Sequence, residues 1–84
     1  MPAKTITVKV LFFGAAADAA EKREENLELP LGVTANNAFE KILTGPLKSL
    51  KPSMMFAVNQ EYSEGNEILR DGDELALIPP VSGG

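Results

Sequence analysis

The sequence predicts a small α+β domain in which one main helix packs across a mixed β-sheet. Three observations carry this prediction. Residues 5–13 alternate between two side-chain faces as a strand does, residues 33–46 carry one amphipathic helix pattern, and residues 74–78 form a short apolar run directly before Pro79. A chain of 84 residues has room for one domain of this kind.

The first strand is predicted over residues 5–13. One of its faces is apolar throughout and holds Ile6, Val8, Val10 and Phe12. The other face starts polar and becomes apolar at its far end, through Leu11 and Phe13. That change indicates that this end of the strand is covered on both sides or meets a partner.

Two weaker segments follow the first strand. Residues 15–22 have high helix propensity but little apolar bulk, which fits either a short helix or an ordered loop. Residues 26–30 alternate again, with Leu27 and Leu29 on one face, and are predicted to be the return strand of a hairpin. The mixed charges of residues 21–25 indicate a solvated face, or a match to a basic partner.

The main helix is predicted within residues 33–46. Thr34 is its expected N-cap, because a threonine hydroxyl can accept a hydrogen bond from a free backbone N–H. Its apolar residues recur at helical spacing and predict a core stripe of Ala35, Ala38, Phe39, Ile42 and Leu43. Gly45 and Pro46 end the pattern.

The remaining chain reads as short strands joined by turns. Residues 47–52 are predicted to be a loop whose leucines pack back on the domain, and residues 61–69 mostly turn with a short edge strand. Strands are predicted over residues 54–60 and 74–78, with an Asp-Gly turn before the second. A first and a last strand lying parallel at the centre would suit the β-grasp topology, which periodicity alone leaves open.

Composition excludes most catalytic classes. The chain has no cysteine and no histidine, which removes thiolate sites, the commonest metal ligand and the usual general base. Asp71, Gly72 and Asp73 resemble the start of a calcium loop, but the later ligands are missing, so a turn is predicted. Nothing suggests a cleft around Asp18 and Glu21. We expect no catalytic side chain, no bound cofactor and no metal site.

The charge balance restricts the partners. Twelve acidic against eight basic residues give a net charge of −4, which argues against nucleic-acid binding. No stretch approaches the length of a membrane span, and no secretory signal is evident. We therefore expect a cytoplasmic protein.

The last residues are predicted to form an extended tail, 79–84, that follows a domain over residues 1–78. Pro79 and Pro80 fix φ and lack backbone donors, so the chain should leave the sheet there. Val81 offers a small apolar contact and Ser82 adds reach; without a histidine, its hydroxyl has no activating base.

Gly83 and Gly84 place a free carboxylate on a backbone without side chains. A partner enzyme can enclose such a backbone and approach its last carbonyl. Adenylation by a partner enzyme with ATP would make the Gly84 carbonyl open to a sulfur or amine nucleophile. On composition alone, a terminal Gly-Gly pair also fits an inert end.

Three segments carry a family resemblance: "KVLFFG" at residues 9–14, "AVNQEY" at residues 57–62 and "DGDELALIPPVSGG" at residues 71–84. They resemble the MoaD family, the small, sulfur-carrier subunit of molybdopterin synthase. The likeness runs across nearly the whole chain and is most specific in the closing segment. It implies a ubiquitin-like β-grasp fold with a flexible C-terminal Gly-Gly tail.

The resemblance also implies a role for the tail. A MoeB-like adenylating enzyme would use ATP to activate Gly84, which then becomes a thiocarboxylate. Inside a MoaE-like large subunit, that group would donate sulfur to cyclic pyranopterin monophosphate, giving molybdopterin. A heterotetramer of two small and two large subunits is implied, with the catalytic side chains on the large subunit.

The resemblance implies docking residues as well. Ile78 and Tyr62 match apolar docking positions of the family, where Phe and Leu are the common types; Phe13 is added from the strand pattern alone. Three alternatives stay open: a carrier like the thiamin-pathway protein ThiS, a ubiquitin-related modifier joined to lysines, and a β-grasp binding module with an inert tail.

Overall fold

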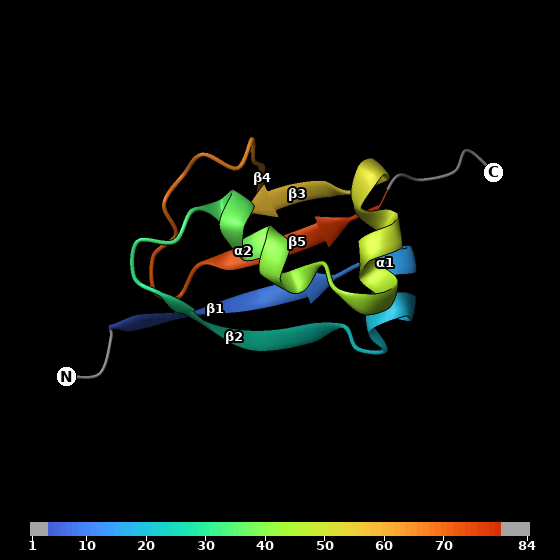
Figure 1. Ribbon diagram of the computed structural model, residues 1–84, viewed down its shortest axis with the longest axis horizontal. Helices are drawn as coiled ribbons and strands as arrows, with labels where there is room; N and C mark the ends of the chain where they lie inside the picture. The colour runs from blue at the N-terminus through green and yellow to red at the C-terminus, as the bar shows by residue number, and fades with distance from the viewer. Residues whose placement is uncertain (1–3, 80–84) are drawn as a thin grey trace.

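The computed structural model describes residues 4–79, apart from the side chains of residues 51–53. Five strands form one sheet in the order β2-β1-β5-β3-β4 (Figure 1). In chain order the strands are β1 (Thr5–Phe12), β2 (Glu24–Pro30), β3 (Met55–Val58), β4 (Glu61–Tyr62) and β5 (Glu74–Ile78).

The pairing directions give the β-grasp topology. The first and last strands, β1 and β5, lie parallel at the centre, with Leu11 opposite Ala76. All other neighbours are antiparallel: β1 with β2, β5 with β3, and β3 with β4. The predicted hairpin return strand is confirmed, although β2 begins at Glu24, two residues earlier than the alternation indicated.

Two α-helices and one 3-10 helix join the strands. The main helix α2 (Ala35–Ile42) lies across one face of the sheet, and α1 (Gly14–Ala20) packs against the 3-10 helix η1 (Gly45–Ser53) where β1 and β5 end (Figure 1). Residues 15–22 are therefore mainly helical. The loop predicted over residues 47–52 is wrong, because the 3-10 helix η1 occupies that segment. The prediction that its leucines pack back on the domain is confirmed, since Leu47 is buried and Leu50 packs against the core.

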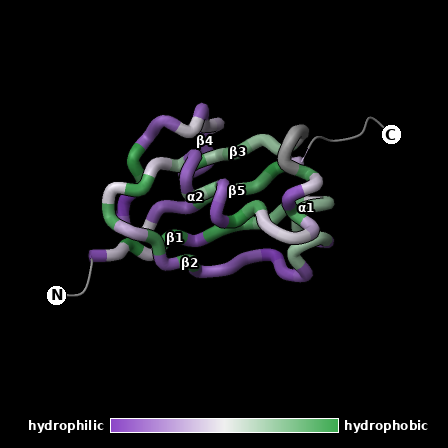
Figure 2. Tube along the Cα trace, in the orientation of Figure 1, coloured by the Kyte–Doolittle hydropathy of each residue, from purple (hydrophilic) through white to green (hydrophobic). Residues whose placement is uncertain are grey.

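The core lies between α2 and the sheet. The whole predicted stripe of α2 is buried, and it faces the β1 residues that the alternation placed inward. Phe39 of α2 stacks on Phe56 of β3, with ring centroids 3.8 Å apart and an interplanar angle of 18°. Figure 2 shows the difference between strands: β5 is mostly hydrophobic, whereas the edge strand β2 is mostly hydrophilic.

The helix start is capped as the sequence predicts. Thr34 Oγ1 accepts a hydrogen bond from the backbone N–H of Asn37 at 3.2 Å. Thr34 also forms an isolated bridge with Ile68, which ties the start of α2 to the loop before β5. Thr34 therefore caps the start of α2 through its side chain and holds that start against the loop before β5 through its backbone.

The turn at residues 71–73 joins three parts of the sheet. Asp71 Oδ1 accepts from the Thr7 N–H at 2.8 Å, and the Gly72 N–H donates back to the Thr7 carbonyl at 2.8 Å. Asp73 accepts from Asn59 Nδ2 at 3.0 Å and from the Arg70 N–H at 2.7 Å. Both carboxylates thus accept from backbone N–H groups, Asp73 also accepts from a side chain, and the predicted turn is confirmed.

Candidate functional site

The sheet face away from α2 carries a row of small and apolar side chains. Strand register places Leu11 opposite Ala76, Ala76 opposite Ala57, and Ala57 opposite Tyr62, so one row crosses four strands. Because side chains alternate along a strand, these residues share the face opposite the core. Tyr62 is 71% exposed there, whereas Ala57 is buried.

A second row lies nearer the end of β5. Ile78 is opposite Met55, and the Phe13 N–H donates to the Leu77 carbonyl at 3.2 Å, which extends the β1–β5 ladder to Phe13. Phe13 and Met55 are 47% and 46% exposed. We call the two rows together the apolar face: Leu11, Phe13, Met55, Ala57, Tyr62, Ala76 and Ile78.

The apolar face brings together the three docking residues that the sequence predicted. Phe13, Tyr62 and Ile78 line one surface hollow of about 430 Å³, with Gln60 and Glu74 at its polar margin. Exposed apolar patches of this kind mark interaction sites in many proteins. The fold thus brings to one surface three residues that are far apart in sequence: Phe13 and Tyr62 are 49 residues apart, and Tyr62 and Ile78 are 16 residues apart. That this surface binds a partner stays a prediction.

The alternation of the first strand also placed Leu11 on this face, but sequence reasoning missed Met55, Ala57 and Ala76. Ala76 could have been found from the alternation of β5, whose Leu75 and Leu77 are fully buried and leave Ala76 and Ile78 on the opposite side. Met55 and Ala57 depend on which strand neighbours β5. That neighbour is set by the fold and has no local signal in the sequence.

Pro79 is the only tail residue of the prediction that the structure describes. It is half-buried and lies against Gly14 at the start of α1: a Cβ on Gly14 would come within 3.2 Å of Pro79 Cγ. The tail therefore begins beside the apolar face. The other predicted tail residues, Pro80, Val81, Ser82, Gly83 and Gly84, lie outside the described residues.

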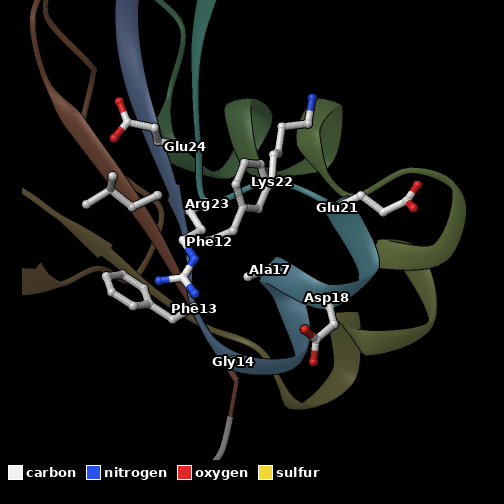
Figure 3. Close-up of a pocket in the computed structure, with 10 residues that line it drawn as sticks. Phe12, Phe13, Gly14, Ala17, Asp18, Glu21, Lys22, Arg23 and Glu24 are labelled. Carbon is white, nitrogen blue, oxygen red and sulfur yellow. The ribbon is translucent and has the colours of Figure 1, made fainter.

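A second surface hollow of about 680 Å³ lies between α1 and the ends of β1 and β2 (Figure 3). It shares Leu11 and Phe13 with the first hollow, and Asp18 and Glu21 line it from α1 and the turn after it. The expectation that no cleft surrounds these two carboxylates is therefore wrong. A helix packed at the end of the sheet creates the concavity, and the local sequence carries no sign of it.

Two ion pairs lie at this end of the domain. Lys9 lies 3.7 Å from Glu24, and Lys22 lies 3.2 Å from Glu25, in each case between charged side-chain atoms. Within residues 4–79, leaving aside the side chains of 51–53, no cluster of three or more acidic residues is arranged to hold a metal ion. No helix in the described part of the chain is long and apolar enough to cross a membrane.

Comparison with known proteins identifies relatives over almost the full length. The ThiS family matches residues 10–84. The molybdopterin synthase sulfur carrier subunit of Chlamydomonas reinhardtii is 38% identical over 81 residues, covering 92% of this chain and 98% of that protein. The subunit of the same name from Caenorhabditis elegans is 39% identical over 84 residues, covering 94% and 99%.

Solved structures agree in fold. SAMP1 from Haloferax volcanii has a TM-score of 0.78 at 26% identity, covering 93% of this chain and 99% of its own. A protein–protein complex of subunits 1 and 2 of molybdopterin-converting factor from Helicobacter pylori contains a chain with a TM-score of 0.66 at 29% identity, covering 94% and 100%. The MoaD-like resemblance and the ubiquitin-like β-grasp fold are confirmed, and the chain belongs to the ThiS family.

Proposed function

We propose that this chain is the sulfur carrier subunit of a molybdopterin synthase. The observation that carries the proposal is the near full-length likeness to proteins of that name at 38–39% identity. The fold adds support, because a tail that follows Pro79 starts beside an exposed apolar face suited to a partner.

The reactive group is the terminal carboxylate of Gly84. The carboxylate attacks the α-phosphate of ATP on a MoeB-like enzyme, giving an acyl-adenylate and pyrophosphate. A sulfide-level nucleophile then forms a C–S bond as AMP leaves, and the product is a thiocarboxylate. Its sulfur attacks a carbon of cyclic pyranopterin monophosphate, forming a C–S bond as a C–O bond of the substrate breaks and the departing oxygen takes a proton. Water then breaks the acyl C–S bond, which leaves the sulfur on the pterin and restores the carboxylate. A second thiocarboxylate supplies the second sulfur of the dithiolene in the same way.

The apolar face is the proposed docking surface for a MoaE-like large subunit. The Helicobacter pylori relative was solved as a complex of subunits 1 and 2, which supports a partner of that kind. Tyr62, Ile78 and Phe13 are the proposed contacts, Pro79 and Pro80 the exit, and Val81 and Ser82 the reach. We further propose a cytoplasmic heterotetramer of two small and two large subunits, with no cofactor held by this chain.

The test measures the intact mass of the protein after incubation with a MoeB-like enzyme, ATP and a sulfur donor. The expected result is a mass gain equal to sulfur replacing oxygen, located at Gly84 by fragmentation. A variant lacking Gly84 serves as the control and should show no such gain. An unchanged mass for the full-length chain under conditions that thiolate a known carrier would reject sulfur carriage.

One observation favours a second function. The fold and 26% identity relate the chain to SAMP1 from Haloferax volcanii. The name SAMP1 stands for small archaeal modifier protein 1, as the structure from Methanosarcina acetivorans spells out. An adenylated Gly84 attacked by a lysine amine instead of sulfur would give an amide, joining the chain to another protein. Covalent conjugates that disappear on deletion of Gly84, found in cell extract without any thiocarboxylate, would favour this modifier role.

A further inference from the structure

The second hollow continues the apolar face around Phe13. Both hollows include Leu11 and Phe13, so a partner that covers the face also reaches the space beside α1. Arg23 stands on the sheet side of that space and lines it together with Phe13; Figure 3 labels both residues at this hollow. Its backbone is held in place, because the Arg23 carbonyl accepts from the Phe12 N–H at 2.9 Å.

Arg23 is the exposed cation of this region that has no ion-pair partner within the described residues. Its neighbours are paired: Lys9 with Glu24 and Lys22 with Glu25. Asp18 and Glu21 line the hollow from the side of α1. An incoming anion is therefore repelled by these two carboxylates on the α1 side and attracted by the guanidinium on the sheet side, where the remaining acid of the lining, Glu24, is paired with Lys9.

Arginine suits the edge of an apolar interface. Its planar fork of N–H donors matches a carboxylate in two parallel hydrogen bonds, and arginine is enriched where protein partners meet. A charge-assisted bond of this kind strengthens when the surrounding apolar contact excludes water. Phe13 and Leu11 would supply that contact once a partner covers them.

We propose that Arg23 is a docking anchor that receives a carboxylate side chain of the large subunit. This inference rests on the proposed function, since it takes the large subunit as the occupant. The chemistry favours a carboxylate over a phosphate, because Asp18, Glu21 and Glu24 also line the hollow and repel a doubly charged anion more strongly.

The experiment compares two charge reversals, Arg23→Glu and Arg70→Glu. Both remove an exposed arginine and change the net charge equally. Arg70, however, precedes the turn at the start of β5, whereas Ile78 of the apolar face lies at the other end of that strand. Affinity for the large subunit of molybdopterin synthase is measured by calorimetry. We expect Arg23→Glu to weaken binding about tenfold or more and Arg70→Glu less than about twofold. Arg23→Lys should fall between them, because it keeps the charge and loses the fork.

A second measurement uses the unmodified chain and so does not depend on the folding of a variant. The Nε–H resonance of Arg23 in ¹⁵N-labelled protein should shift when the large subunit is added. Equal effects of the two reversals, or an unmoved Arg23 resonance in a complex that forms, would overturn this inference alone. Failure of the unmodified chain to bind the large subunit would overturn the proposed docking as well.

Discussion

Gly14 and Pro79 are in close contact at the point where the last strand ends. A Cβ on Gly14 would lie 3.2 Å from Pro79 Cγ, which is tighter than most real Cβ contacts. Gly14 also has φ of +50°, a conformation that L side chains rarely adopt. The start of α1 thus accommodates the first residue of the tail because position 14 has no side chain.

Gly14→Ala should therefore destabilise the protein for two reasons. The left-handed backbone costs about 1–2 kcal/mol for a residue with a Cβ, and the added methyl also presses on Pro79. Gly45→Ala is the matched control, since Gly45 has φ of +57° but no atom within 4 Å of an added Cβ. Urea denaturation should show the larger loss for Gly14→Ala. Equal losses would mean that Pro79 yields freely and that the contact has no energetic weight.

Asp73 should contribute more to stability than its only partly buried position suggests. Its carboxylate accepts from Asn59 Nδ2 and from the Arg70 N–H, and its carbonyl accepts from the Lys9 N–H. Asp73→Ala removes both side-chain bonds and should lower the free energy of unfolding by about 1–3 kcal/mol. Asp18→Ala, on the exposed surface of α1, should change it by less than about 0.5 kcal/mol. Similar midpoints for both variants in urea would contradict the proposed bracing role of Asp73.

Loss of the N-cap of α2 should lower the stability of the protein by a smaller amount than loss of Asp73. Thr34→Ala removes the acceptor for the Asn37 N–H and should cost about 1 kcal/mol. Thr44→Ala, at an exposed threonine just beyond the helix, is the control and should be close to neutral. Thermal unfolding followed by circular dichroism distinguishes the two. A lower midpoint for Thr44→Ala than for Thr34→Ala would show that the cap is not what stabilises this end of α2.

Much of the fold was predictable because the pattern of each segment matches its final environment. The β1 alternation separated core from surface correctly, and the α2 stripe is buried at all five positions. The error at residues 47–52 has a physical cause. Pro46 and Pro52 bracket a stretch without helical periodicity, yet burial of Leu47 against the core stabilises a 3-10 helix there. Tertiary packing of that kind leaves no local signal.

The site was predictable only in part. The apolar end of β1 pointed to Phe13, while Tyr62 and Ile78 came from the resemblance, and the register brings all three to one face. Met55 and the hollow beside α1 could not be inferred, because each depends on which distant segments become neighbours. Arg23 lay in a stretch read as a solvated face, and its place in the lining of the same hollow as Phe13 appears only in the folded chain.

Docking through the apolar face is tested most directly at Ile78. Ile78→Asp would bury an unpaired carboxylate in the complex, and the penalty of doing so should weaken binding of the large subunit at least about tenfold. Ile68→Asp makes the same change at a 63% exposed isoleucine in the loop before β5, which lies outside the face, and should leave the affinity within about twofold. The affinity of each variant is measured by calorimetry, after circular dichroism confirms that it folds. Unchanged affinity for a folded Ile78→Asp, or an equal loss for Ile68→Asp, would remove Ile78 from the interface, because only a residue covered by the partner makes the added charge costly.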